Sequence, residues 1–372
     1  MKRVFMIIIV LIVTVLTACN QEKTIKIGYT GCITGTNSDL GVSGMYGAML
    51  AVNEINNRGG IQNKKIELIV KDDKGIPEIG LAVDKELVKE NCIAIVGHMT
   101  SDMAELSIPY INKQKIPMIS PTIALATLND KDDYFIRLIP STEEQANQFS
   151  LEIQKVGIKQ VLVVSSLQNQ IFAKSIYSYL SSELNNRKVL TEYYGPVDFT
   201  STEQVTATID KIVQSNAQAI VIIASADAVA QISQSMYLIN QTKTVFLPAW
   251  SMTNDLIQRG GVSVNGYYGV SFINYQEYSA KYRKFNEEYI KTYGSNPTFA
   301  SVMSYEALML LYEGLKENPN IKSEELKNKI LNQKVFQGLQ GDVLINEFGD
   351  ASRNLYLYQI RNGAFVKVDR ND

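Results

Sequence analysis

The sequence predicts an α/β protein of two doubly wound lobes with a cleft between them. From Thr24 onward, short apolar runs rich in β-branched residues alternate with helical patterns, which is typical of a parallel sheet covered by helices. This alternation pauses over residues 121–140 and then starts again, so it occurs twice. The chain has 372 residues, and a single hydrophobic core stops growing near ~250 to 300 residues. Two lobes therefore fit the chain better than one.

The strand and helix patterns can be followed in order. The predicted strands cover residues 25–29, 66–70, 92–97, 160–165, 219–224 and 244–247. Residues 44–57 carry an apolar helical stripe that ends before two glycines, and residues 77–90 begin with proline, which is favoured in the first helical turn. Ser141 followed by Glu144 fits a capping box, so a new helix begins there. After a crossing segment at 269–275, the helical patterns are 278–293 and 298–315.

The N-terminus predicts export. Two basic residues precede an apolar run that ends at Leu16 and is followed by small residues, as in a secretion signal. The run is shorter than the ~20 residues that span a bilayer, which disfavours a permanent transmembrane helix. Leu16-Thr17-Ala18-Cys19 resembles a bacterial lipobox, in which the cysteine becomes the lipidated first residue. We expect a signal peptide over 1–18 and a tether over 19–23, lipid-anchored at Cys19 on the outer face of the cell membrane. Ordinary cleavage near Ala18 is the alternative.

The composition argues against nucleic acid as a partner. The chain has 36 Lys and Arg against 38 Asp and Glu, a formal net charge of −2, and no basic patch or arm.

Residues 25–61 carry a family resemblance. They read IKIGYTGCITGTNSDLGVSGMYGAMLAVNEINNRGGI. This segment resembles the opening of the branched-chain amino-acid (Leu/Ile/Val)-binding family of ABC-transporter solute-binding proteins. The similarity continues through IVGHMTS and KIPMISPT, and it returns in YGSNPTFASVMSYEAL and GLQGDVLINEFGD.

The resemblance implies the type I periplasmic-binding-protein fold, in which two lobes are joined by a three-segment hinge and close on a ligand. By analogy, the first lobe is expected over residues 24–139 plus 272–340. The second lobe is expected over 140–271 plus 341–372.

Ser101 is the leading candidate for ligand contact. Residues 97–102 follow a predicted strand and open a helix, where unpaired amides and a hydroxyl suit a carboxylate. The resemblance implies that Ser101 and neighbouring amides, with Thr100 and Asp102 beside it, hold the ligand. The alternative is that Ser101 or Thr100 only caps its own helix.

The turn after residue 120 is the second candidate in the first lobe. The family pattern uses a backbone group and then a hydroxyl, and these positions correspond to Thr122 and Ala124. The hydroxyl is therefore missing from its usual place, and Thr122 is one replacement. Leu40 stands where an aromatic residue is common, and we expect it to form an apolar wall of the site.

In the second lobe, family positions for the ligand correspond to Gln168, Ser225 and Trp250. These residues lack the features that read an aliphatic α-amino acid, including the acidic partner of the ligand ammonium. An unpaired buried ammonium costs several kcal/mol. Asp102 or Asp227 therefore supplies that charge, or the ligand has no ammonium. Trp250, the only tryptophan, follows a predicted strand, where ligand loops gather, although packing is the alternative role.

Enzyme chemistry has little support in the sequence. His98 is the only histidine, which excludes multi-histidine metal sites and leaves one candidate base for a Ser/His/Asp triad. We interpret His98 as structural and expect no cofactor and no metal. The expected function is capture of a small carboxylate-bearing solute, an amino acid or related organic acid, for an ABC permease. A sensor domain of the same fold and a lipoprotein hydrolase are the alternatives.

Overall fold

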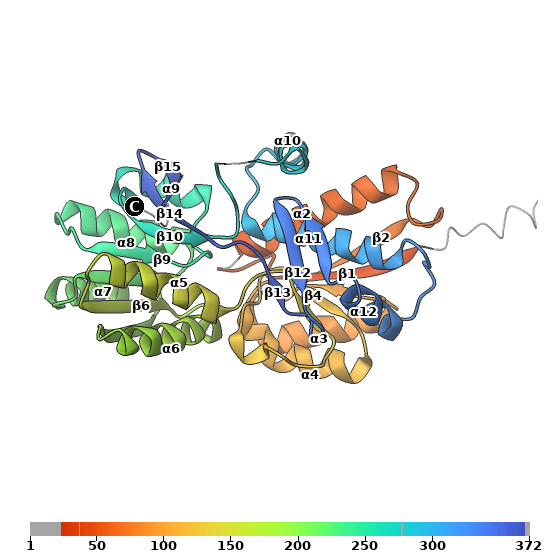
Figure 1. The fold of residues 1–372 in the computed structure, drawn as a ribbon, viewed down its shortest axis with the longest axis horizontal. Coiled ribbons are helices and arrows are strands. Elements are labelled where there is room, and N and C mark those ends of the chain that lie inside the picture. The colour runs from red at the N-terminus through yellow and green to blue at the C-terminus, as the bar shows by residue number, and fades with distance from the viewer. Residues whose placement is uncertain (1–23, 37, 277, 369–372) are drawn as a thin grey trace, which may run out of the picture.

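The computed structural model describes residues 24–36, 38–276 and 278–368, which form two α/β lobes side by side (Figure 1). The predicted signal peptide, Cys19 and the tether lie outside the described residues. No helix within the described part of the chain combines the length and the apolar character needed to cross a membrane.

The first lobe is built on a five-stranded parallel sheet. Across the sheet its strands are β2 (Ile66–Asp72), β1 (Ile25–Gly31), β3 (Ile95–Val96), β4 (Met118–Ser120) and β5 (Phe135–Arg137). One face is covered by α2 (Ser38–Asn57) and α11 (Phe299–Leu315), and the other by α3 (Pro77–Lys89) and α4 (Ala104–Gln114). Helices on both faces account for the nearly continuous burial of β1 and β3.

Shorter elements complete the first lobe. They are the 3-10 turns η1 (Ser101–Met103) and η2 (Ala126–Leu128), the helices α10 (Ala280–Tyr293) and α12 (Ser323–Leu331), and the small antiparallel sheet of β11 (Val335–Gly338), β12 (Gly341–Ile345) and β13 (Ala351–Ser352).

The second lobe repeats the plan with a seven-stranded sheet. Its strands, in order, are β15 (Ala364–Lys367), β14 (Tyr356–Arg361), β10 (Tyr268–Ser271), β9 (Thr244–Leu247), β8 (Ala219–Ile223), β6 (Gln160–Ser166) and β7 (Leu190–Val197). From β10 to β7 the strands are parallel, whereas β14 and β15 are antiparallel. The helices are α5 (Thr142–Lys155), α6 (Gln170–Asn186), α7 (Thr202–Gln214), α8 (Ala226–Leu238) and α9 (Asn254–Gly260), followed by the 3-10 turn η3 (Gly261–Val264). The predicted fold class is confirmed.

The chain passes between the lobes three times: after β5, after β10 and after β13. We expected the third passage at residue 341, and this expectation is wrong. A hairpin turn joins β11 to β12, with Gly338 paired to Gly341, and β13 pairs with β12. Arg137 of β5 also forms an ion pair with Asp350. Residues 341–352 therefore lie in the first lobe.

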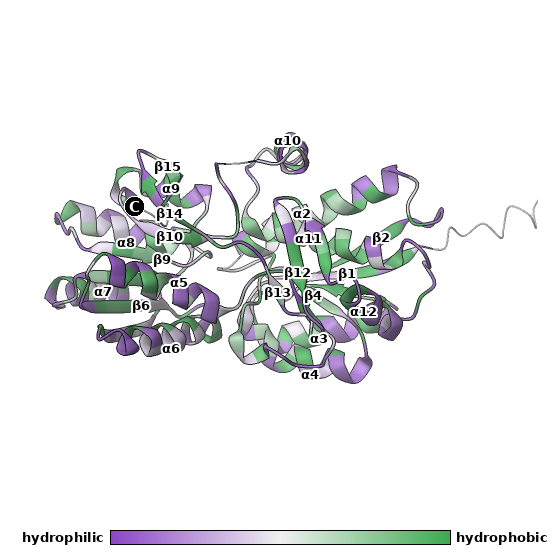
Figure 2. Ribbon diagram, viewed as in Figure 1, coloured by the Kyte–Doolittle hydropathy of each residue, from purple (hydrophilic) through white to green (hydrophobic). Residues whose placement is uncertain are grey.

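The apolar core continues from one lobe into the other. One cluster of buried residues includes Leu40 and Met99 of the first lobe together with Phe172 and Trp250 of the second. Figure 2 shows the apolar residues along the central strands of both sheets and polar residues on the outer helices. The two lobes are therefore in contact around the predicted cleft.

Candidate ligand-binding cleft

Ser101 lies at the lobe interface. It begins η1, directly after the turn that follows β3, and its side chain is 1% exposed. Its backbone N–H donates to Oδ1 of Asn169 in the second lobe at 2.9 Å. Within the described chain the Ser101 hydroxyl has no hydrogen-bond partner. A buried hydroxyl left unpaired is uncommon in native proteins and indicates a site for a ligand or ordered water.

Trp250 brings a second unpaired donor from the opposite lobe. It follows β9 and is 3% exposed, and its ring meets Phe172 edge-on at 6.1 Å. Its indole N–H has no partner among the described residues, and the same is true of the Thr253 hydroxyl nearby in the chain. Phe172 is in the same turn of α6 that follows Asn169, the partner of Ser101. These donors suit an acceptor-rich group such as a carboxylate.

Asp102 joins the two lobes through hydrogen bonds to α6. Its carboxylate accepts from the N–H of Gln170 at 3.2 Å and of Ile171 at 2.8 Å, in the first turn of α6. Burial raises the pKa of this carboxyl above its usual value. Each Asp102 oxygen accepts one N–H and keeps a further lone pair, so pairing of Asp102 with a ligand ammonium stays a prediction.

The other predicted first-lobe residues are buried beside Ser101. The Thr122 hydroxyl donates to the Met99 carbonyl at 2.7 Å, so that its proton is not free for a ligand. The Ala124 carbonyl accepts from the Thr142 N–H at 2.6 Å. Thr100 precedes η1 without a side-chain capping bond, and Leu40 is 4% exposed in the apolar cluster. Ligand contact by these four residues stays a prediction.

Three of the predicted second-lobe residues make contacts within their own lobe. Gln168 accepts from the Ser166 hydroxyl at 2.7 Å, and Ser225 caps α8 by accepting from the Ala228 N–H at 3.4 Å. The Asp227 side chain is 75% exposed and forms an ion pair with Arg259 at 2.8 Å. Asp227 therefore does not supply a buried carboxylate to a ligand. This corrects the expectation that Asp227 could pair with a ligand ammonium.

Asn169 and Asp39 were not predicted from the sequence as residues of the lobe interface. Asn169 has a left-handed backbone conformation (φ 52°), and an asparagine just before a helix was the available signal. Asp39, in the first turn of α2, has its pKa raised to about 6, chiefly by desolvation and to a lesser degree by the charge of Asp255 in the second lobe. The charge of a second-lobe carboxylate therefore acts on a first-lobe carboxylate.

His98 is fully occupied by structural contacts. Nδ1 lies 2.7 Å from Asp73 and Nε2 lies 3.1 Å from Asp84. Burial alone would lower the pKa of His98, but the charge of Asp84 and hydrogen bonds with both carboxylates raise it to about 10. An imidazolium held in this way cannot take a proton from Ser101. The geometry gives no support to a hydrolase triad.

Solved structures share this fold. A leucine-binding protein of Thermotoga maritima superposes with a TM-score of 0.82 at 20% identity, covering 93% of this chain and 98% of that one. A branched-chain amino-acid transporter substrate-binding protein of Streptococcus pneumoniae in complex with isoleucine gives 0.80 at 23%, covering 93% and 100%. A solute-binding protein of an R. palustris ABC transporter in complex with benzoate gives 0.84 at 17%, covering 93% and 95%.

Curated relatives match over a shorter length. A leucine-, isoleucine-, valine-, threonine- and alanine-binding protein of Pseudomonas aeruginosa is 29% identical over 99 residues, 27% of this chain and 26% of the relative. A Leu/Ile/Val-binding protein of Rhizobium johnstonii is 31% identical over 107 residues, 29% of each chain. The match thus spans less than a third of these relatives. The resemblance found in residues 25–61 is confirmed. Because the model of the periplasmic binding protein family matches residues 24–364, the chain belongs to that family.

Proposed function

We propose that this protein captures a small carboxylate-bearing solute between its lobes and delivers it to an ABC permease. The observation that carries the proposal is the pair of buried, unpaired donors, the Ser101 hydroxyl and the Trp250 indole N–H, on opposite lobes. A carboxylate has enough lone pairs to accept from both lobes at once. A ligand that bonds to both lobes favours the closed arrangement, because those bonds are lost when the lobes separate.

The available charges favour an organic acid without an ammonium group. Asp102 is bonded to α6, and Asp227 is exposed and paired with Arg259. Asp39 and Asp255 are exposed, in α2 and α9 respectively. Asp102 is partly buried, but its oxygens already accept from two amides. A buried ammonium would therefore have an incomplete carboxylate partner, and an unpaired buried ammonium costs several kcal/mol. A ligand in the chemical class of the benzoate bound by the R. palustris protein satisfies this restriction better than leucine.

Calorimetric titration tests this assignment. We expect binding of one or more small carboxylic acids, and weaker or no binding of the matching α-amino acids. Ser101→Ala removes a hydrogen bond to a charged group, worth about 1.5–3 kcal/mol, so affinity should fall by roughly tenfold or more. Ser178→Ala, on the exposed side of α6, is the matched control and should bind normally. Unchanged affinity in Ser101→Ala would refute the site.

The proposal includes anchoring through Cys19, in keeping with the short apolar leader before it. The five residues 19–23 can extend at most about 17 Å, which would keep the first lobe near the membrane surface. Metabolic labelling with a radioactive fatty acid should mark the wild-type protein and leave Cys19→Ser unmarked. Equal labelling of both proteins, or of neither, would reject the anchor.

A further inference from the structure

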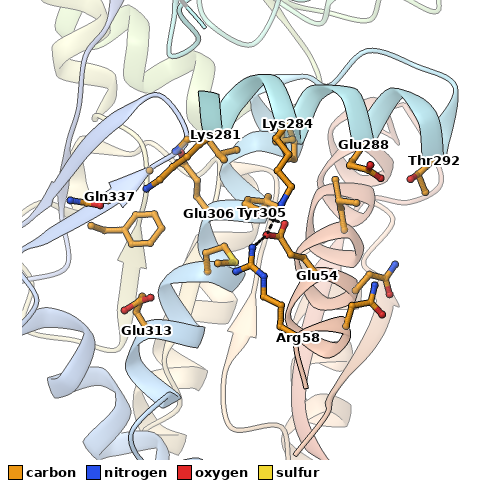
Figure 3. Close-up of a pocket in the computed structure, with 18 of the residues that line it drawn as sticks. Glu54, Arg58, Lys281, Lys284, Glu288, Thr292, Tyr305, Glu306, Glu313 and Gln337 are labelled. Carbon is orange, nitrogen blue, oxygen red and sulfur yellow. Dashed lines mark hydrogen bonds and ion pairs between the residues drawn. The ribbon is translucent and has the colours of Figure 1, made fainter. Parts of the chain in front are cut away.

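The first lobe has a groove away from the predicted cleft (Figure 3). It encloses about 860 Å³ between α10, α11, the C-terminal half of α2 and strand β11. This volume is within the range of about 300–1,000 Å³ that is usual for small-molecule pockets. Its lining comes from the first lobe alone, and Ser101 and Trp250 are not part of it.

The floor of this groove is apolar. Leu50 of α2, Phe285 of α10 and Phe336 of β11 are at least nine-tenths buried and line it, together with Leu339 and the partly buried Met309. Apolar surface of this extent, open on one side, suits a hydrocarbon or aryl body.

The carboxylates around the groove already have cationic partners. Glu54 forms an ion pair with Arg58 and accepts from the Tyr305 hydroxyl at 2.7 Å. Buried Glu306 pairs with Arg353 at 2.7 Å. The two remaining lining carboxylates, Glu288 and Glu313, pair with Lys291 and Lys316. None of these groups is left to receive a cationic ligand.

The lysines of α10 are less well matched. Lys284 lies 3.7 Å from Glu54, which already has a closer cation. Lys281 has no carboxylate within ion-pair distance anywhere in the described residues, and Figure 3 shows both lysines extending from α10 over the groove. Among the described residues, the charge that remains unmatched at this groove is therefore positive, and it lies at one end of an apolar floor.

We propose that the groove is a second binding site, for a medium-chain carboxylate. Its hydrocarbon chain would lie on Phe285 and Phe336, and its carboxylate would meet the Lys281 ammonium. Such a ligand supplies a negative charge to Lys281 and covers the small part of the apolar floor that stays open to solvent. This site is independent of the cleft, so it goes beyond the solute-binding function proposed above.

Calorimetric titration of the whole exported protein with decanoate tests the second site. We expect saturable binding to the wild type, and none with decyltrimethylammonium, which has the same chain and the opposite charge. Lys281→Glu should weaken decanoate by at least roughly tenfold, because it replaces an attractive charge with a repulsive one. Lys113→Glu is the matched control. Lys113 is exposed on α4 and does not line the groove, so this variant should bind normally.

A third variant separates this site from the cleft. Ser101→Ala should leave decanoate affinity unchanged. If Ser101→Ala abolishes binding, decanoate occupies the cleft and the second site is rejected, while the proposed function stands. No binding to the wild type, or equal binding by Lys281→Glu and Lys113→Glu, would also overturn the proposal.

Discussion

His98 shows how a single residue can hold the turn beside Ser101. Its ring bridges Asp73 and Asp84, from the loop after β2 and from α3, and all three side chains are at most 1% exposed. Removing one partner of a buried ion pair leaves an uncompensated charge, which costs about 3–5 kcal/mol. This network accounts for the burial of the only histidine. It agrees with the interpretation of His98 as a structural residue.

We predict that His98→Gln lowers the free energy of unfolding by about 3–5 kcal/mol at neutral pH. The folded-state pKa of His98, about 10, is above the value of 6.5 for an unperturbed histidine. Its stabilising effect is therefore complete below pH 6.5 and is lost as the pH rises toward 10. Urea unfolding of both proteins across this range measures the difference. A difference that stays constant from pH 6 to pH 10 would contradict the raised pKa.

At the scale of single residues, the places of the candidate residues in the fold could be predicted better than the groups that they contact. Ser101 is predicted because it follows a strand and opens a helix whose amides suit a carboxylate, and Trp250 because it follows a strand where ligand loops gather. The role of Asp102 could not be predicted, because its partners Gln170 and Ile171 are 68 and 69 residues away in the chain. Only folding brings them together.

Helix α2 shows the limits of periodicity at the scale of one element. The stripe predicted a helix from residue 44, whereas α2 begins at Ser38. Glycines at 41 and 47 weakened the pattern, since glycine is a poor helix former. They are needed for close packing: a Cβ on Gly47 would lie 2.0 Å from the Ser301 carbonyl of α11. Residues that look unfavourable locally can thus be required by tertiary contact.

Helix α5 was predicted more closely, because its signal is local. It begins at Thr142 after Ser141, as the capping-box pattern indicates, although the Ser141 side chain makes no capping bond. The predicted start of the helix is therefore confirmed, whereas the capping bond expected from Ser141 is not made.

The N-terminus of α6 supports closure of the lobes. We predict that Asp102→Ala weakens ligand binding by roughly tenfold, because closure would leave the Gln170 and Ile171 amides without their acceptor, at about 1–3 kcal/mol. Asp210→Ala, exposed on α7, is the control and should bind normally. Calorimetry with the best-bound acid measures both. Full affinity in Asp102→Ala would show that this contact does not contribute to closure.

At the scale of the molecule, the repeated β and α pattern was enough to predict two lobes. The position of the third passage between them was predicted wrongly, because the pairing of β11, β12 and β13 is decided by tertiary contacts. Gly341, with φ +119°, completes the hairpin after a two-residue turn. The sequence contains that glycine, but it does not indicate which lobe the hairpin joins. That information comes from contacts such as Arg137 with Asp350.

The central claim is that the solute lies between the lobes, and the only tryptophan reports on this directly. Trp250 emission should be measured while the acid found by calorimetry is added. We predict a saturable change in emission, with the same dissociation constant as calorimetry, and its loss or a shift of roughly tenfold in Ser101→Ala. Binding heat with no change in Trp250 emission would contradict the account, because the solute would then occupy another part of the molecule.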